Sequence, residues 1–118
     1  MDSAVADYFA RAGHPVVRTA SLGMTTNYGI ASVTADQLIA LARQVDAPEI
    51  DTIVIPGGNL QAMALLPAIE AELRKPIVIT NQACMWAVAG MLGVSLGPGF
   101  GRLATADPDW AIRRALRA

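Results

Sequence analysis

The chain has 118 residues, of which 53% are hydrophobic and 16% charged, with nine basic and ten acidic side chains. This composition is typical of one packed globular domain and excludes a disordered, charge-rich tail. The near-zero net charge, without a basic stripe interleaved with aromatic residues, argues against a nucleic-acid partner. The single cysteine excludes an internal disulfide and indicates a reducing compartment, so we expect a cytoplasmic protein.

Two stretches bear on membrane targeting. Residues 1–4 lack the basic and long apolar regions of a signal peptide, so none is expected. Residues 76–101 carry no charge, but their apolar part, residues 83–96, is shorter than the ~20 residues that a spanning helix needs. We therefore expect no membrane contact and interpret residues 83–96 as a helix buried in the core.

The N-terminal third predicts a helix, a strand and a second helix. Apolar residues between positions 5 and 12 have helical spacing, and Gly13 is a typical stop. Residues 15–22 have the pattern of a strand. Thr34 and Gln37 form a capping-box pattern in front of an apolar stripe that runs to Val45, which predicts a helix there.

The remainder alternates short strands with helices. Residues 52–55 and 76–79 are β-branched apolar runs, typical of strands buried on both faces. A helix is expected between them with its start near Pro67, because proline is tolerated only in the first turn. Another is expected over residues 81–92, and the last begins near residue 107.

This alternation predicts an α/β fold in which a small parallel sheet is flanked by helices. Ligands of such sheets bind beyond the carboxyl ends of the strands, which singles out the loops at residues 23–29, 56–59 and 80–82. A sheet of three strands is thin, and its edges need a partner from missing chain or a second subunit.

The loop at residues 56–59 reads Pro-Gly-Gly-Asn. Gly57 and Gly58 allow a sharp turn and a close approach to a ligand, and amides at a helix N-terminus can bind an anion. An ordinary strand-to-helix turn capped by Asn59 explains the pattern equally well.

The other two loops carry polar side chains. Thr80 or Asn81 is a natural N-cap, but the run of three polar residues with Gln82 exceeds what a cap needs, which favours a binding role. Asn27 is typical of a turn, and its amide is also able to bind a carboxylate.

Other reactive residues give weaker signals. Cys84 lies one turn into a predicted helix among apolar neighbours, so we expect a buried, inert thiol. His14 lies at a helix-to-strand turn and is expected at the surface. With one histidine and one cysteine, the chain is a poor candidate for a zinc site, and no cofactor is expected.

The same loops resemble the maleate isomerase branch of the aspartate/glutamate racemase superfamily, with arylmalonate decarboxylase a more distant relative. The most specific segment is residues 76–86, Pro-Ile-Val-Ile-Thr-Asn-Gln-Ala-Cys-Met-Trp. The resemblance covers about residues 7–103, so we expect a single α/β domain over residues 1–103 and an added helical tail over residues 104–118.

The resemblance implies a site and a mechanism. Members of the superfamily have two similar α/β halves with a small carboxylic acid between them, and they use cysteines without cofactor or metal. It implies that Asn27 binds a substrate carboxylate and that the loop of Gly57, Gly58 and Asn59 lines the same site, to which the polar run adds Thr80 and Asn81. Gly57, or Pro56 if the register slips by one, stands where the second half has its cysteine. No catalytic residue is therefore expected in this chain.

Three hypotheses remain open. The chain is the C-terminal half of an isomerase, racemase or decarboxylase-like enzyme, whose nucleophile comes from a missing N-terminal half. Alternatively, it is a non-catalytic module that binds small dicarboxylates or other carboxylates. A third possibility is a homodimer that associates through an exposed sheet edge and an apolar face, without a ligand.

Overall fold

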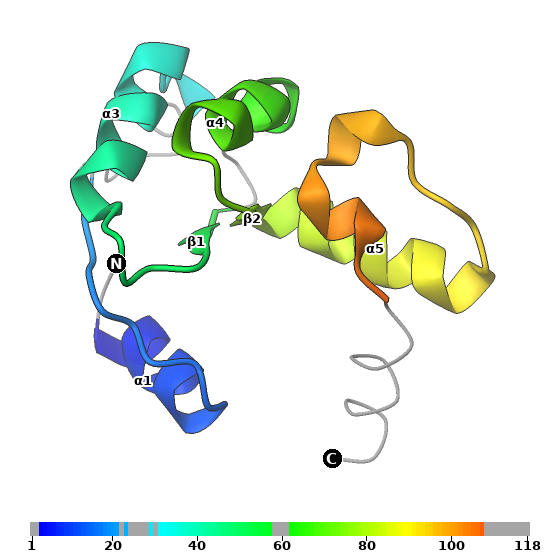
Figure 1. Ribbon diagram of the computed structural model, residues 1–118, viewed down its shortest axis with the longest axis horizontal. Helices are drawn as coiled ribbons and strands as arrows, with labels where there is room; N and C mark the ends of the chain where they lie inside the picture. Colours follow the sequence, from blue (N-terminus) through cyan, green and yellow to red (C-terminus); the bar gives the residue numbers. More distant parts are fainter. Residues whose placement is uncertain (1–2, 22, 24–28, 30, 58–61, 108–118) are drawn as a thin grey trace. The chain divides into compact units, whose positions relative to one another are not determined.

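A computed structural model describes residues 3–21, 23, 29, 31–57 and 62–107. The chain divides into two compact units, residues 1–50 and residues 51–118, and each is described by itself. Figure 1 labels the helices and strands. No described helix has the length and hydropathy needed to cross a membrane.

The helices of the first unit include α1 (Ser3–Arg11) and α3 (Ala35–Val45). After α1 the chain turns at Gly13, whose φ of +88° is a conformation that glycine adopts readily, so the predicted stop is confirmed. His14 is exposed, as expected.

The start of α3 has the predicted capping box. The Gln37 backbone N–H donates to the Thr34 hydroxyl at 3.2 Å, and the Thr34 N–H donates to the Gln37 side-chain oxygen at 2.9 Å. Two members of the predicted apolar stripe, Leu38 and Ala42, are buried. Local sequence thus determines where this helix begins and which face it buries.

The strand predicted over residues 15–22 is wrong for its described part, because residues 15–21 form no strand. Most of these residues are exposed, including Val17, and the described sheet contains only two other strands. A strand requires a hydrogen-bonded neighbour, and the apolar pattern of a segment does not supply one.

The second unit is built on two parallel strands, β1 (Ile53–Ile55) and β2 (Ile77–Ile79), paired residue for residue from Ile53 with Ile77 to Ile55 with Ile79. Ile53, Ile77 and Ile79 are buried, which confirms the two predicted core strands. The fold is thus a small α/β arrangement with a parallel sheet, as predicted, although the sheet has two described strands.

The crossover between the strands contains a 3-10 turn, η1 (Met63–Leu65), followed by α4 (Leu66–Leu73). Pro67 lies at the start of α4, as predicted, where its missing N–H costs no helical hydrogen bond. The helix buries an apolar face that contains Leu66, Ile69 and Leu73.

After β2 the chain enters α5 (Thr80–Leu92), followed by two 3-10 turns, η2 (Pro98–Phe100) and η3 (Arg102–Thr105). The predicted helix over residues 81–92 is confirmed, but its expected burial is wrong. Only Gln82 and Ala89 of α5 are buried. The last predicted helix, apart from Asp107, lies outside the described residues.

One buried carboxylate joins three parts of the second unit. Glu70 on α4 is 6% exposed and accepts hydrogen bonds from the backbone N–H groups of Ile77 at 3.1 Å and Arg102 at 3.0 and 3.2 Å. Gly101 packs against the same carboxylate, so closely that a Cβ there would lie 2.8 Å from a Glu70 oxygen. Glu70 therefore holds the start of η3 against α4 and β2.

Candidate functional site

The candidate site lies where β1 and β2 end. Because the strands are parallel and in register, the residues after Ile55 and after Ile79 leave the sheet at the same edge. Here the Gly57 backbone N–H donates to the Thr80 hydroxyl oxygen at 2.9 Å, in a partly buried position. Two of the predicted site residues, 23 positions apart in the sequence, are thus in direct contact.

The backbone at Gly57 explains the choice of glycine. Its φ is +144°, a conformation that side-chain-bearing L residues rarely adopt. A cysteine in this position would therefore be strained. The strand-end turn is consequently shaped around backbone atoms.

Thr80 does not cap α5, so the alternative interpretation, in which it or Asn81 is only an N-cap, does not hold. Thr80 is the first residue of the helix, Ile79 is the N-cap, and the Ile79 N–H donates to the side-chain oxygen of Gln82 at 3.0 Å. Because the Gln82 side chain accepts the hydrogen bond of the backbone N–H at the helix start, the Thr80 hydroxyl is available to contact Gly57.

Gln82 belongs to the polar run that favoured a binding role, but its side chain contacts backbone groups of its own unit. It is completely buried, and its Nε2 donates to the Phe100 carbonyl at 2.7 Å. One side chain therefore links the start of α5 to η2. The signal was present in the run of three polar residues before an apolar helix, but its partner at residue 100 is not predictable from local pattern.

The other predicted site residues divide into two groups. Asn81 is exposed in the first turn of α5, one position after Thr80. Asn27, Gly58 and Asn59 lie outside the described residues, and their part in a carboxylate site stays a prediction.

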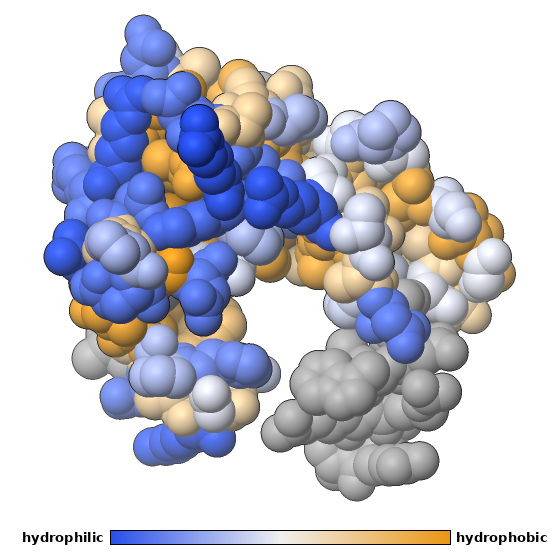
Figure 2. Space-filling model, in the orientation of Figure 1, coloured by the Kyte–Doolittle hydropathy of each residue, from blue (hydrophilic) through white to orange (hydrophobic). Residues whose placement is uncertain are grey.

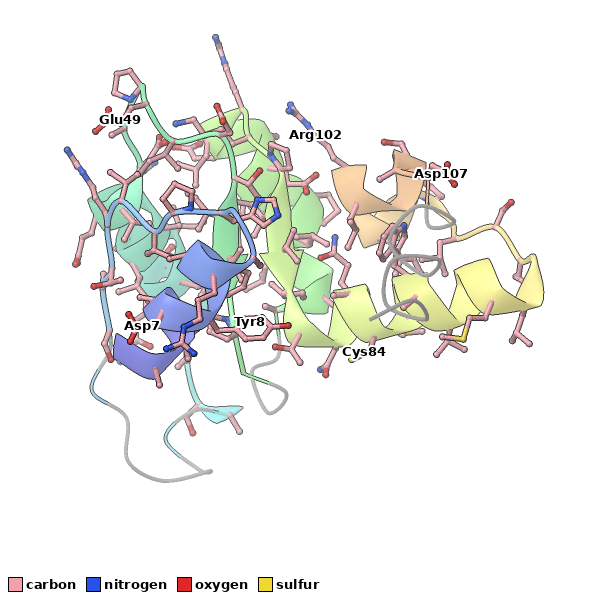
Figure 3. The ribbon with its side chains drawn as sticks, turned by 90° about the horizontal axis from the view of Figure 1, so that it is seen from below. Asp7, Tyr8, Glu49, Cys84, Arg102 and Asp107 are labelled. Atoms are coloured by element: carbon pink, nitrogen blue, oxygen red, sulfur yellow. The ribbon has the colours of Figure 1, made fainter. Side chains whose placement is uncertain are left out.

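The thiol of Cys84 is exposed, so the expectation of a buried cysteine is wrong. Figure 3 shows it at the outer edge of α5. The apolar neighbours in sequence did not bury it, because α5 buries only the side that contains Gln82 and Ala89. In the described part of the chain, no three His, Cys, Asp or Glu side chains cluster as a metal site would require.

The described site offers neutral hydrogen-bonding groups. A hydroxyl has one proton to donate and two lone pairs, so Thr80 is able to accept from Gly57 and donate to a ligand oxygen. Gly57, Thr80 and Asn81 are uncharged, and none of them has a side chain that readily donates a proton. This chemistry suits the holding of an anionic ligand.

Comparison with known proteins decides the family. A sequence model of the arylmalonate decarboxylase family matches residues 1–104. The chain belongs to the arylmalonate decarboxylase family. It is 31% identical, over 87 residues, to an arylmalonate decarboxylase from Bordetella bronchiseptica; the match covers 70% of this chain and 36% of that protein.

Solved structures of arylmalonate decarboxylase have the same fold. One crystal structure superimposes with a TM-score of 0.75 at 28% identity, and covers 86% of this chain and 46% of that one. The structure of a glycine-to-cysteine mutant in its sulfate-associated form superimposes with a TM-score of 0.76 at 27% identity, with the same coverage of both chains. The predicted superfamily is confirmed, and the matching branch is the one that the sequence had suggested as more distant. The chain spans less than half the length of these family members.

Proposed function

We propose that this chain is the C-terminal half of a cofactor-independent arylmalonate decarboxylase-type enzyme that acts on small carboxylic acids. In this proposal it binds the substrate carboxylates and has no activity alone. The observation that supports it most directly is the hydrogen bond between Gly57 and Thr80 at the carboxyl ends of the two strands. Ligands of parallel sheets bind beyond this edge.

The proposed lack of activity follows from the chemistry of the site. Decarboxylation of a malonate leaves a carbanion, and racemisation or isomerisation also needs an acid, a base or a nucleophile. Gly57 has no side chain, and its φ of +144° disfavours any other residue. Cys84 lies on the exposed surface of α5, one turn beyond Thr80. By the resemblance, family members have ordinary helix residues at this position, so Cys84 does not replace the missing cysteine. In this proposal the reactive group therefore comes from outside these 118 residues.

Binding is tested by titrating the isotope-labelled chain with malonate and phenylmalonate while following backbone amide shifts. We expect saturable shifts of the Gly57 and Thr80 amides at millimolar ligand, with the amide of Val94, beyond the far end of α5, as an internal reference. The same shifts produced by sodium chloride at equal ionic strength would show only a salt effect. Absence of any shift at residues 57 and 80 would refute the proposal.

The role of the Thr80 hydroxyl is tested with a pair of substitutions. Thr80→Val removes the acceptor of the Gly57 N–H and is expected to weaken malonate binding about five- to tenfold, equivalent to one neutral hydrogen bond. Thr80→Ser keeps the hydroxyl and should bind within about twofold of the parent, since the change leaves that hydrogen bond available. Thr105→Val is the matched control, because the Thr105 hydroxyl contacts the Arg102 carbonyl on η3.

The alternative is a non-catalytic carboxylate-binding module, which the glycine at position 57 favours. The DNA sequence upstream of the Met1 codon, followed by co-expression, distinguishes the half-enzyme from the binding module. If it encodes an N-terminal half, co-expression of both halves should produce decarboxylase, isomerase or racemase activity. Carboxylate binding without any activity on co-expression would support the binding module.

A further inference from the structure

One edge of β2 is covered by buried side chains of the same unit. Successive backbone N–H groups of a strand point to opposite edges, so Ile77 and Ile79 direct theirs to the same edge. Ile77 donates to Glu70 on α4 at 3.1 Å, and Ile79 donates to Gln82 on α5 at 3.0 Å. Both bonds end on side chains, so this edge is the one that faces away from β1. Glu70 and Gln82 therefore take the place of a neighbouring strand there.

The same two side chains also reach the part of the chain that follows α5. Glu70 accepts from the backbone N–H of Arg102 in η3, and Gln82 donates to the backbone carbonyl of Phe100 in η2 at 2.7 Å. Each side chain thus bridges β2 to residues 100–102, Glu70 at the start of the strand and Gln82 at its carboxyl end. The two bridges are built alike, but they lie at opposite ends of the strand.

The Gln82 bridge lies at the candidate carboxylate site. Its side-chain oxygen accepts from Ile79, the last residue of β2, and the next residue is Thr80, whose hydroxyl accepts from the Gly57 N–H at 2.9 Å. The η2 turn also contacts η1 and α4, which follow β1 from the same edge of the sheet. Gln82 and η2 therefore lie beside the strand ends where the ligand is proposed to bind, whereas the Glu70 bridge lies at the other end of β2.

The surroundings of Gln82 offer its amide few alternative partners. The side chain is completely buried, and neither α5 nor η2 contains a charged residue. Figure 2 shows mostly hydrophobic to weakly polar surface over this part of the molecule. A buried amide that loses one of its partners gains no hydrogen bond to water in return. Both bonds therefore hold the amide, and with it the two backbone groups that it joins, in fixed positions.

We propose that Gln82 is a positioning residue of the carboxylate site and acts through the peptide between Ile79 and Thr80. This inference rests on the proposed function, because it assumes a carboxylate beside Gly57 and Thr80. The Gln82 oxygen fixes the Ile79 N–H, and its Nε2 ties that arrangement to η2. The Thr80 hydroxyl is thereby held where it accepts from Gly57 and has its proton available for a ligand oxygen. A hydrogen-bond donor that is misaligned loses much of its attraction for the ligand, so this support determines affinity.

The experiment compares Gln82→Met with Glu70→Met in the whole chain. Malonate affinity is measured from the shifts of the Gly57 and Thr80 amides, at a temperature where circular dichroism shows each variant to be folded. We expect Gln82→Met to weaken binding about tenfold, equivalent to one well-aligned hydrogen bond. Glu70→Met is the matched control, because it removes the bridge at the other end of β2, and it should bind within about twofold of the parent. Equal weakening by the two variants, or unchanged affinity in Gln82→Met, would overturn the proposal.

A measurement on the unchanged chain does not depend on whether the variants fold. The side-chain amide of Gln82 gives an NMR signal of its own, separate from the backbone amides. We expect malonate to shift this signal and the Ile79 amide with the same affinity as the Gly57 amide, and to leave the Ile77 amide unchanged. Absence of both shifts, or an equal shift at Ile77, would overturn the positioning role.

The positioning role and the proposed function are distinguished in the chain without ligand. The Gly57 amide reports its hydrogen bond to Thr80 through its chemical shift and the temperature dependence of that shift. We expect Gln82→Met to change both quantities and Glu70→Met to change neither. An unchanged Gly57 amide in Gln82→Met would refute the positioning role alone, whereas absence of malonate binding to the parent chain would refute the proposed function.

Discussion

Replacing Glu70 with alanine is expected to destabilise the chain, because its carboxylate connects α4, β2 and η3. The side chain is 6% exposed and accepts from two backbone donors, the N–H groups of Ile77 and Arg102. A hydrogen bond to a charged group contributes about 1.5–3 kcal/mol, and relief of the buried charge offsets part of the loss. We therefore expect the free energy of unfolding to fall by about 3 kcal/mol.

The assay is urea unfolding followed by far-ultraviolet circular dichroism. Glu70→Gln keeps the shape of the side chain and one acceptor oxygen, so it should lower the free energy of unfolding less than Glu70→Ala does, by about 1–2 kcal/mol. Glu72→Ala removes the same charge from an exposed position on the same helix and should cost less than about 1 kcal/mol. If Glu70→Ala and Glu72→Ala agree within about 0.5 kcal/mol, the anchoring role of Glu70 is wrong.

Three further substitutions test individual features of the fold by the same assay. Gly101→Ala should lower the free energy of unfolding by about 2 kcal/mol more than Gly93→Ala. Both glycines have φ of +68°, but only at residue 101 does an added Cβ collide with the Glu70 carboxylate. Equal losses of stability in the two variants would contradict this contact. Gln82→Leu should lower the free energy of unfolding by about 2–4 kcal/mol, since it leaves the buried Ile79 N–H and the partly buried Phe100 carbonyl without their partner. A neutral effect would contradict this role. Thr34→Ala should cost about 1 kcal/mol and Thr34→Ser much less, because serine retains the capping oxygen; an equal loss with serine would show that the cap is not responsible.

The sequence by itself determined the features that depend on near neighbours. The β-branched runs became β1 and β2, the Thr34 and Gln37 pair became the capping box of α3, and Pro67 marked the start of α4. In each case the backbone preference or the partner lies within a few residues, so the pattern contains the information.

Only the tertiary structure decided the features whose partners are distant in the chain. Thr80 contacts Gly57 across 23 residues, Gln82 contacts Phe100 across 18, and Glu70 contacts Arg102 across 32. The same limit explains the errors: a strand over residues 15–22 needs a neighbour that no local pattern names, and burial of Cys84 depends on what packs against that side of α5. Hydropathy indicates that a side chain can be buried, but only the packing of other elements against it removes that side chain from water.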